Sequence, residues 1–331
     1  MGRVPLQGLI NGFVPVILPI LALSAIHTYT VLSVDKHSPP SIHKALLTEK
    51  GGYEIQITEL QASDSNAILK NRIKAKPKLS PVLNLPQNVS IGGPKFAAPD
   101  ITRGNLLKNE LSITFDGGSE ATGADEILNI LRGKNIKTTI FLTGDFIKRY
   151  PDIVFKMVED GHEIGNHSLT HPHLTTFEKN FKQQTLPDVN KEFVTEQLKE
   201  TARIFKKTTG KDMAPLWRAP YGEQNAEIRQ WAYEAGFTHV GWTTDRKRKE
   251  TLDTLDWVSD EESEFYHSAE EIKERILNFD KGGSGVKGGI VLMHLGTERK
   301  AGHVYTKLPE IIDSLGERGY KFVKVSELLK K

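Results

Sequence analysis

From residue 111 to the C-terminus, short apolar runs alternate with longer amphipathic segments. The runs are rich in β-branched and aromatic residues, as in Leu111–Phe115, which is typical of buried strands. Strands are expected at 111–115, 138–142, 162–164, 237–242, 290–293 and 321–323. Helices are expected at 123–133, 151–160, 191–207, 226–235, 269–278 and 307–318. This alternation predicts an α/β fold with a parallel sheet flanked by helices, in which ligands bind at the carboxyl ends of the strands.

The N-terminal residues follow a different pattern. Arg3 precedes a mainly apolar stretch over 9–34, whose central part, 13–25, has the length of a signal-peptide core. The whole stretch also exceeds the roughly 20 apolar residues that span a bilayer. Residues 1–34 are therefore expected to be a signal peptide or a membrane anchor, with a buried N-terminal helix as the alternative. Either form of export places the rest of the chain outside the cytoplasm, in the periplasm or the cell envelope.

Residues 35–105 are punctuated by proline and glycine, as in Pro39-Pro40 and Pro77, with short alternating runs such as Tyr53–Ile57 between them. Because proline and glycine interrupt regular structure, this segment is expected to be an extracytoplasmic spacer with a few short edge strands. A disordered stalk is the alternative. The domain that carries the function is then expected over 106–331.

The composition limits the chemistry that the chain can use. Its 331 residues contain no cysteine, which excludes disulfides, thiol catalysis and cysteine-bound metal. A metal ion would therefore have to bind to histidine, aspartate or glutamate. A formal net charge of +2 is too small to indicate a nucleic acid as partner. The sequence makes no prediction of the oligomeric state.

Several polar residues follow the predicted strands. Asp116 closes the strand 111–115 and precedes two glycines. His167 and His171 are four residues apart, so one helical turn would place both imidazoles on the same side. That spacing suits zinc or a similar cation. An acidic turn residue and a chance pair of histidines are the alternatives.

Three more residues are candidates for proton transfer or for its support. Arg218 lies two residues before a proline, and its guanidinium could hold a catalytic carboxylate ionised. Asp256 lies in an acidic segment beside a tryptophan, and His294 ends the strand 290–293. A surface arginine, an exposed acidic turn and a structural histidine are the alternatives. The order of these residues along the chain is more informative than any one of them.

Five short motifs follow one another in that order. They are Thr114-Phe115-Asp116, His167-x-x-x-His171, Arg218-x-Pro220-Tyr221, Asp253-x-x-Asp256-Trp257 and Leu292-x-His294. Together they resemble the five motifs of the polysaccharide deacetylase family, the carbohydrate esterases with a NodB homology domain. The resemblance covers about residues 108–331, and five ordered motifs make it highly specific.

The resemblance implies a distorted (β/α) barrel, preceded here by the N-terminal apolar segment and the proline-rich spacer. It also implies a single divalent metal ion, usually zinc and sometimes cobalt or nickel. His167 and His171 would then be metal ligands. Asp116 would be the general base, and Arg218 would hold it.

The remaining motif residues take their roles from the same resemblance. His294 would be the general acid, and Asp256 would tune it. The backbone N–H of Tyr221 would help to stabilise the oxyanion. Trp257 and Leu292 would shape the pocket for the acetyl methyl group.

The first motif departs from the family pattern at Gly117. The usual motif reads Thr-Phe-Asp-Asp-Gly, and its second aspartate is the third metal ligand. Because glycine has no side chain, the metal must lose a ligand or take another from Asp116, Glu120, water or the substrate. Gly117 therefore favours one alternative, a catalytically silent glycan-binding member of the family. The presence of both Asp116 and His294 argues against that alternative.

The predicted function is metal-dependent hydrolysis of acetyl groups, most of all N-acetyl groups, on a cell-envelope or extracellular glycan. The expected partner is an acetylated polysaccharide, either peptidoglycan or an N-acetylglucosamine polymer. An O-acetyl polysaccharide esterase is a second alternative, because the same groups cleave esters and the sequence does not distinguish the two bonds. The segment 1–34 predicts an association with the membrane.

Overall fold

A computed structural model describes residues 97–118 and 120–330, together with four strands in the N-terminal part of the chain. The chain divides into one unit over Met1–Ile91 and a second over Gly92–Lys331. In the first unit the strands form an antiparallel sheet in chain order. They are β1 (Val16–Pro19), β2 (Ile26–Ser33), β3 (Ser41–Thr48) and β4 (Gln56–Leu60).

Two of these strands, β1 and β2, lie within the segment 1–34 that is predicted to be a signal peptide or an anchor. None of the helices in the described part of the chain has both the length and the apolar character needed to span a bilayer. The other residues of this segment, and most of the spacer, lie outside the described residues. β3, β4 and β5 are short strands within the predicted spacer.

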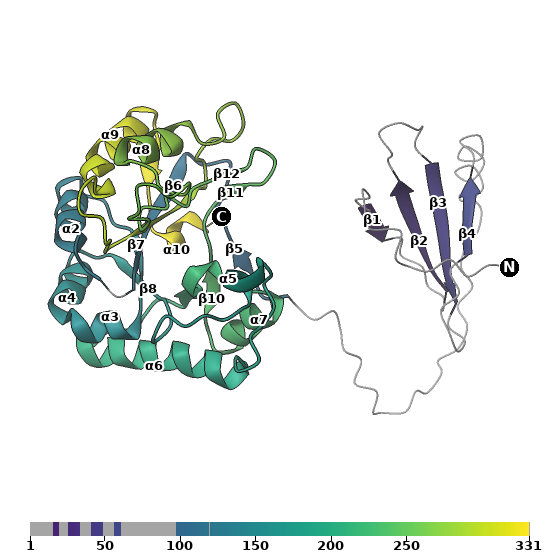
Figure 1. The fold of residues 1–331 in the computed structure, drawn as a ribbon, viewed down its shortest axis with the longest axis horizontal. Helices are drawn as coiled ribbons and strands as arrows, with labels where there is room; N and C mark the ends of the chain where they lie inside the picture. Colours follow the sequence, from purple (N-terminus) through teal and green to yellow (C-terminus); the bar gives the residue numbers. More distant parts are fainter. Residues whose placement is uncertain are drawn as a thin grey trace. The chain divides into compact units, whose positions relative to one another are not determined.

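The second unit is built on a parallel sheet in the order β13-β6-β7-β8-β9-β10-β5, with β14 paired to β6 (Figure 1). The strands are β5 (Asp100–Ile101), β6 (Glu110–Gly117), β7 (Thr139–Leu142), β8 (Glu163–Asn166), β9 (Leu216–Trp217), β10 (Thr238–Val240), β13 (Ile290–His294) and β14 (Lys321–Phe322). The separate strands β11 (Thr244–Asp245) and β12 (Glu250–Thr251) form a hairpin. The large sheet is a half-barrel, which confirms the predicted α/β architecture of a distorted barrel.

Helices cover the outside of this sheet (Figure 1). They are α2 (Ala124–Gly133), α3 (Gly144–Arg149), α4 (Pro151–Glu159), α5 (Phe177–Asn180), α6 (Lys191–Thr209), α7 (Ala226–Glu234), α8 (Ala269–Asn278), α9 (Leu308–Glu317) and α10 (Val325–Leu328). Side chains fix several of the starts, as Asn190 does for α6 and Asn225 for α7. The six predicted helices are confirmed, whereas the prediction missed the short helices α3, α5 and α10. Thr143 caps α3 directly after β7.

The alternation of side chains along the strands positions the site. Phe115 of β6 and Met293 of β13 belong to the core between the sheet and the helices. Because neighbouring side chains on a strand point to opposite faces, Asp116 and His294 point to the interior of the half-barrel. These two residues are partners in the parallel register of β6 and β13. The register therefore brings two residues that are 178 apart in sequence next to each other.

The second unit begins before residue 106, where the sequence placed the boundary. Its edge strand β5 pairs with β10, and Nδ1 of His239 lies 2.8 Å from Oδ1 of Asp100. Residues 100–105 thus form the edge strand β5 and the loop that follows it. A strand of two residues has no periodicity, so the sequence pattern gave no signal for it.

Candidate active site

Asp116 lies at the carboxyl end of β6 and is only 4% exposed. Its Oδ1 accepts a hydrogen bond of 2.8 Å from Nη1 of Arg218, which is fully buried. The guanidinium also donates to two backbone carbonyls at the end of β10. Burial raises the pKa of the Asp116 carboxyl, but Arg218 and two histidines lower that pKa by more. Asp116 is therefore ionised at neutral pH.

His167 follows β8 and faces this carboxylate. Its Nδ1 lies 2.9 Å from the backbone carbonyl of Arg218, and because a carbonyl only accepts, Nδ1 carries the hydrogen. Nε2 then has a free lone pair and lies 3.5 Å from Oδ2 of Asp116. Burial lowers the pKa of His167, so the imidazole is neutral and Nε2 is a potential metal ligand.

His171 lies beside His167, with 4.8 Å between the ring centroids. Burial and the neighbouring His167 lower its pKa to about 3. The two histidines lie on an irregular loop and not on a helix, so the prediction of a helical turn is wrong. Ser168 and His171 both have left-handed backbone, with φ of 67° and 58°. These two residues bend the loop so that the rings still meet.

The donor atoms of this cluster suit a divalent cation. Nε2 of His167 and Oδ2 of Asp116 are both acceptors, so a cation would remove the repulsion between their lone pairs. Within the described residues, however, no three histidine, aspartate or glutamate side chains are grouped to hold a metal. His167 and His171, which the sequence predicted as metal ligands, therefore stand without a third protein ligand among the described residues.

The position of the missing third ligand is filled by apolar side chains. A Cβ atom at Gly117 would lie 2.6 Å from Cδ2 of Leu142 and 3.1 Å from Cδ1 of Leu295. The described structure thus has no room for an aspartate side chain at this position unless its neighbours shift.

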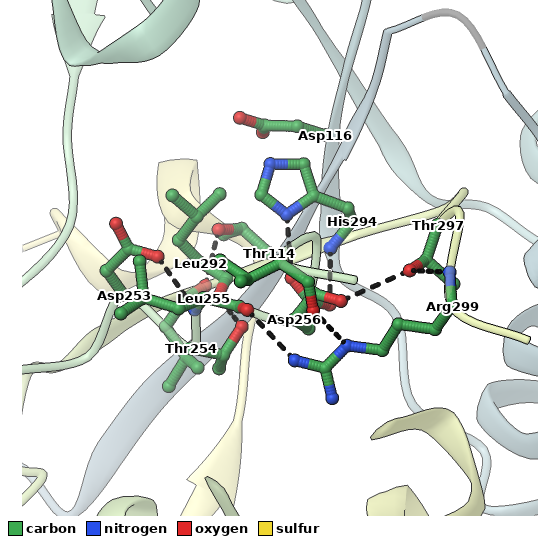
Figure 2. A network of polar contacts seen from close by, with 12 residues as sticks. Thr114, Asp116, Asp253, Thr254, Leu255, Asp256, Leu292, His294, Thr297 and Arg299 are labelled. Atoms are coloured by element: carbon green, nitrogen blue, oxygen red, sulfur yellow. Dashed lines mark hydrogen bonds and ion pairs between the residues drawn. The ribbon is translucent and has the colours of Figure 1, made fainter. Parts of the chain in front are cut away.

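His294 ends β13 and is bound twice by Asp256 (Figure 2). Its Nδ1 lies 2.7 Å from Oδ1 of Asp256, and its backbone N–H donates to Oδ2 at 2.9 Å. Figure 2 shows Asp116 on the opposite side of the imidazole. Burial lowers the pKa of His294, but the carboxylates, above all Asp256, raise it to about 9. The imidazole is therefore protonated at neutral pH.

The three predicted substrate-binding residues occupy different positions. Tyr221 lies in a short 3-10 turn, Pro220–Gly222, and its ring centroid is 4.4 Å from that of His171. Leu292 is buried on the same face of β13 as His294. Trp257 is 53% exposed and follows Asp256 on the loop. The structure thus brings Tyr221 and Leu292 directly beside the polar groups.

Two further buried charged residues lie on the loops around the site, and the sequence gave no signal for either. Oε2 of Glu223 accepts hydrogen bonds from the N–H groups of Leu174 and Thr175, at 2.6 and 2.9 Å. Its Oε1 lies 2.9 Å from Nδ1 of His173, whose ring stacks on Tyr221 with centroids 4.1 Å apart. Arg299 is the other residue. The partners of both are largely backbone groups, which leave no pattern in a sequence.

Comparison with known proteins supports one family. A family model described as polysaccharide deacetylase matches residues 103–240. A peptidoglycan-N-acetylglucosamine deacetylase of Bacillus cereus is 30% identical over 229 residues, which are 68% of this chain and 70% of that protein.

Two solved structures have the same fold. One is the Bc1960 peptidoglycan N-acetylglucosamine deacetylase, with a TM-score of 0.56 and 27% identity over 69% of this chain and 92% of that one. The other is a CE4 family pseudoenzyme from Bacillus anthracis, with a TM-score of 0.55 and 24% identity. This similarity covers 71% of our chain and 70% of the pseudoenzyme. At that identity the second likeness shows the fold alone.

Proposed function

The chain belongs to the polysaccharide deacetylase family of hydrolases, and we propose on this basis that it removes N-acetyl groups from peptidoglycan. One observation carries the proposal. An ionised carboxylate, Asp116, and a protonated imidazole, His294, lie on neighbouring strand ends with opposite pKa shifts. A base and an acid on two sides of one reacting group are what amide hydrolysis requires.

Asp116 acts as the general base in this proposal. It accepts a proton from a water molecule as the water oxygen attacks the carbonyl carbon of the acetyl group. Arg218 holds the carboxylate in place and keeps it ionised. The backbone N–H of Tyr221 helps to stabilise the negative oxygen, since the turn that carries Tyr221 lies beside His171.

His294 acts as the general acid. Its protonated imidazole donates a proton to the amide nitrogen as the carbon–nitrogen bond breaks, which releases acetate and leaves a free amine on the sugar. Asp256 keeps the imidazole charged and fixes its orientation through Nδ1. Leu292 and Trp257 are assigned to the pocket for the acetyl methyl group.

We assign His167 and His171 as the ligands of a divalent metal ion, with zinc as the first choice and cobalt or nickel as alternatives. When bound, such an ion polarises the acetyl carbonyl. The neutral state of both imidazoles supports the assignment, because only a neutral imidazole has a lone pair to offer. Peptidoglycan as substrate also places the second unit outside the cytoplasm, as an anchored or secreted protein.

A silent glycan-binding protein is the second candidate, because the third metal ligand is absent at Gly117. The two functions are separated by incubating the purified chain and zinc with peptidoglycan and analysing the muropeptides by mass spectrometry. Acetylated xylan tests for the esterase, and Asp116→Asn is the control. The proposal predicts muropeptides that lack acetyl groups with the native chain only. Intact muropeptides that nevertheless bind the folded chain would identify a binder and contradict the hydrolase.

A further inference from the structure

Arg299 is a buried cation that no carboxylate neutralises within the described residues. It is 4% exposed, and its guanidinium donates to three backbone carbonyls. The acceptors are Val258 at 2.8 Å, His267 at 2.9 Å and Leu255 at 3.1 Å. The guanidinium also lies 4.5 Å from the ring centroid of Tyr266. Burial of a charge is costly, so this arrangement calls for a reason beyond the general stability of the fold.

All three carbonyls belong to one irregular loop, which runs from β12 to α8. Before Asp256 in the sequence, this loop is attached to β13 through Thr254. Its hydroxyl and its backbone N–H both donate to the carbonyl of Leu292. Leu255 has left-handed backbone, with φ of 56°. A conformation that is unfavourable for leucine persists only where its surroundings hold it.

Arg299 contacts the backbone on both sides of Asp256 in the sequence. Leu255 precedes this aspartate, and Val258 follows it by two residues. A second connection runs through Thr297, whose hydroxyl accepts from the N–H of Arg299 and donates to the carbonyl of Asp256. Figure 2 shows these contacts around the Asp256–His294 pair. His294 ends β13, and Arg299 follows it by five residues, so both residues that hold the loop come from one short segment of the chain.

We propose that Arg299 is a positioning residue that holds the turn 255–258, so that both oxygens of Asp256 remain on His294. This inference rests on the proposed function, in which His294 is the general acid. Arg299 touches neither His294 nor the reacting atoms and acts through the backbone of the loop.

Loss of the Arg299 charge and displacement of Asp256 would shift the pKa of His294 in opposite directions, so the pKa distinguishes the two effects. Removing a positive charge from the neighbourhood raises the pKa of an imidazole. Releasing Asp256 lowers the pKa, because burial then dominates. The carboxylates of Asp116 and Asp253 and the two other site histidines also face His294, and they remain in every variant.

The experiment is an NMR titration of the His294 imidazole in the full-length protein, in Arg299→Gln and in Arg299→Lys. The starting value is a pKa of about 9. We expect Arg299→Gln to lower this pKa by at least about one unit, a tenfold loss of proton affinity. Arg299→Lys keeps the charge without the planar fork, so a smaller fall is expected. If Arg299→Gln fails to fold, the lysine variant alone decides, because an unchanged pKa contradicts the proposal.

Arg103→Gln is the matched control. Arg103 also donates to two backbone carbonyls, those of Gly285 and Lys287, but on a different loop. Its removal is expected to leave the pKa of His294 at its native value. An unchanged or raised pKa in the folded Arg299 variants would overturn the proposal. A fall in the pKa of His294 in the variants, together with a native protein that releases no acetate, would support the positioning role and contradict the proposed hydrolase.

Discussion

Asp116 and His294 are paired across two neighbouring strands, and their pKa values are shifted in opposite directions. Arg218 and the histidines keep Asp116 ionised, whereas Asp256 keeps His294 protonated despite burial. Neither state would follow from burial alone, since burial favours the neutral form of each group. The buried partners therefore define which group gives a proton and which accepts one.

The raised pKa of His294 predicts the alkaline limit of activity. Because the imidazole must be protonated to act as the acid, kcat/KM should fall as the pH rises through about 9. Asp256→Asn removes the negative charge that raises this pKa, so the alkaline limb should move down by at least about one pH unit. Acetate release measured from pH 5 to 11 locates the alkaline limb of the native protein and that of Asp256→Asn. An alkaline limb that stays near pH 9 in Asp256→Asn would contradict the assigned pair.

Gly117 predicts a weak metal site that substitution can strengthen. Gly117→Asp alone brings its Cβ within 2.6 Å of Cδ2 of Leu142, and overpacking of this kind costs about 1–3 kcal/mol. Gly117→Asp with Leu142→Val removes the nearest of these clashes, and the family pattern predicts that the new aspartate then supplies a third ligand. The double variant should bind zinc at least about tenfold more tightly, or by about 1.4 kcal/mol, in competition titrations with a chelator. Leu142→Val alone is the control, and equal affinity in the double variant would contradict the account of Gly117.

Much of the candidate site at this scale was predictable. All nine predicted site residues come from the ordered motifs, and the structure brings Asp116, Arg218, His167 and His171 into one cluster. Glu223 and Arg299 were not predictable. Their hydrogen bonds go mainly to backbone groups of distant loops, and any residue type supplies those groups.

At the level of the elements, the loops after the strands set the geometry of the site. The sequence predicted the strands that end at Asp116 and His294, because their apolar runs are clear. It predicted a helical turn for the histidine pair, whereas two left-handed residues, Ser168 and His171, make this a bent loop. Spacing alone does not distinguish one turn of helix from such a loop.

Glu223 links the loop of the histidines to the turn of Tyr221, and we predict that it stabilises the fold. Glu223→Ala leaves the N–H groups of Leu174 and Thr175 without their acceptor, at a cost of about 1–3 kcal/mol for each buried group. Urea unfolding should show this loss of stability. Glu178→Ala is the control, since Glu178 is largely exposed and lies 3.6 Å from Nε2 of His173 in a surface ion pair. Its effect should stay within about 0.5 kcal/mol, and an equally small effect of Glu223→Ala would contradict the structural role.

At the scale of the whole molecule, the chain has two units, and the site lies entirely in the second. The alternation of strands and helices was sufficient to predict a parallel sheet with its site at the strand ends. The edge strand β5 and the short β9 escaped prediction, because each has two residues and neither lies in a clear apolar run. The predicted extracytoplasmic location and membrane association of the chain remain predictions.

The extent of the second unit gives a prediction for truncated chains. A fragment of residues 92–331 retains β5, whereas one of residues 106–331 loses β5 and the Asp100 partner of buried His239. We expect both to fold, with a Tm about 5 °C lower for the shorter fragment, in line with a loss of about 1–2 kcal/mol. Thermal unfolding followed by circular dichroism measures the difference. Equal Tm values would show that β5 contributes nothing to this unit.

The most direct test of the central claim is acetate release from N-acetylglucosamine oligomers by the metal-stripped protein before and after zinc is restored. We predict release only with zinc, no release by His167→Ala, and a loss of at least about 100-fold in Asp116→Asn. A folded, zinc-treated protein that releases no acetate from oligomers or peptidoglycan would contradict the account. So would release that continues unchanged in Asp116→Asn.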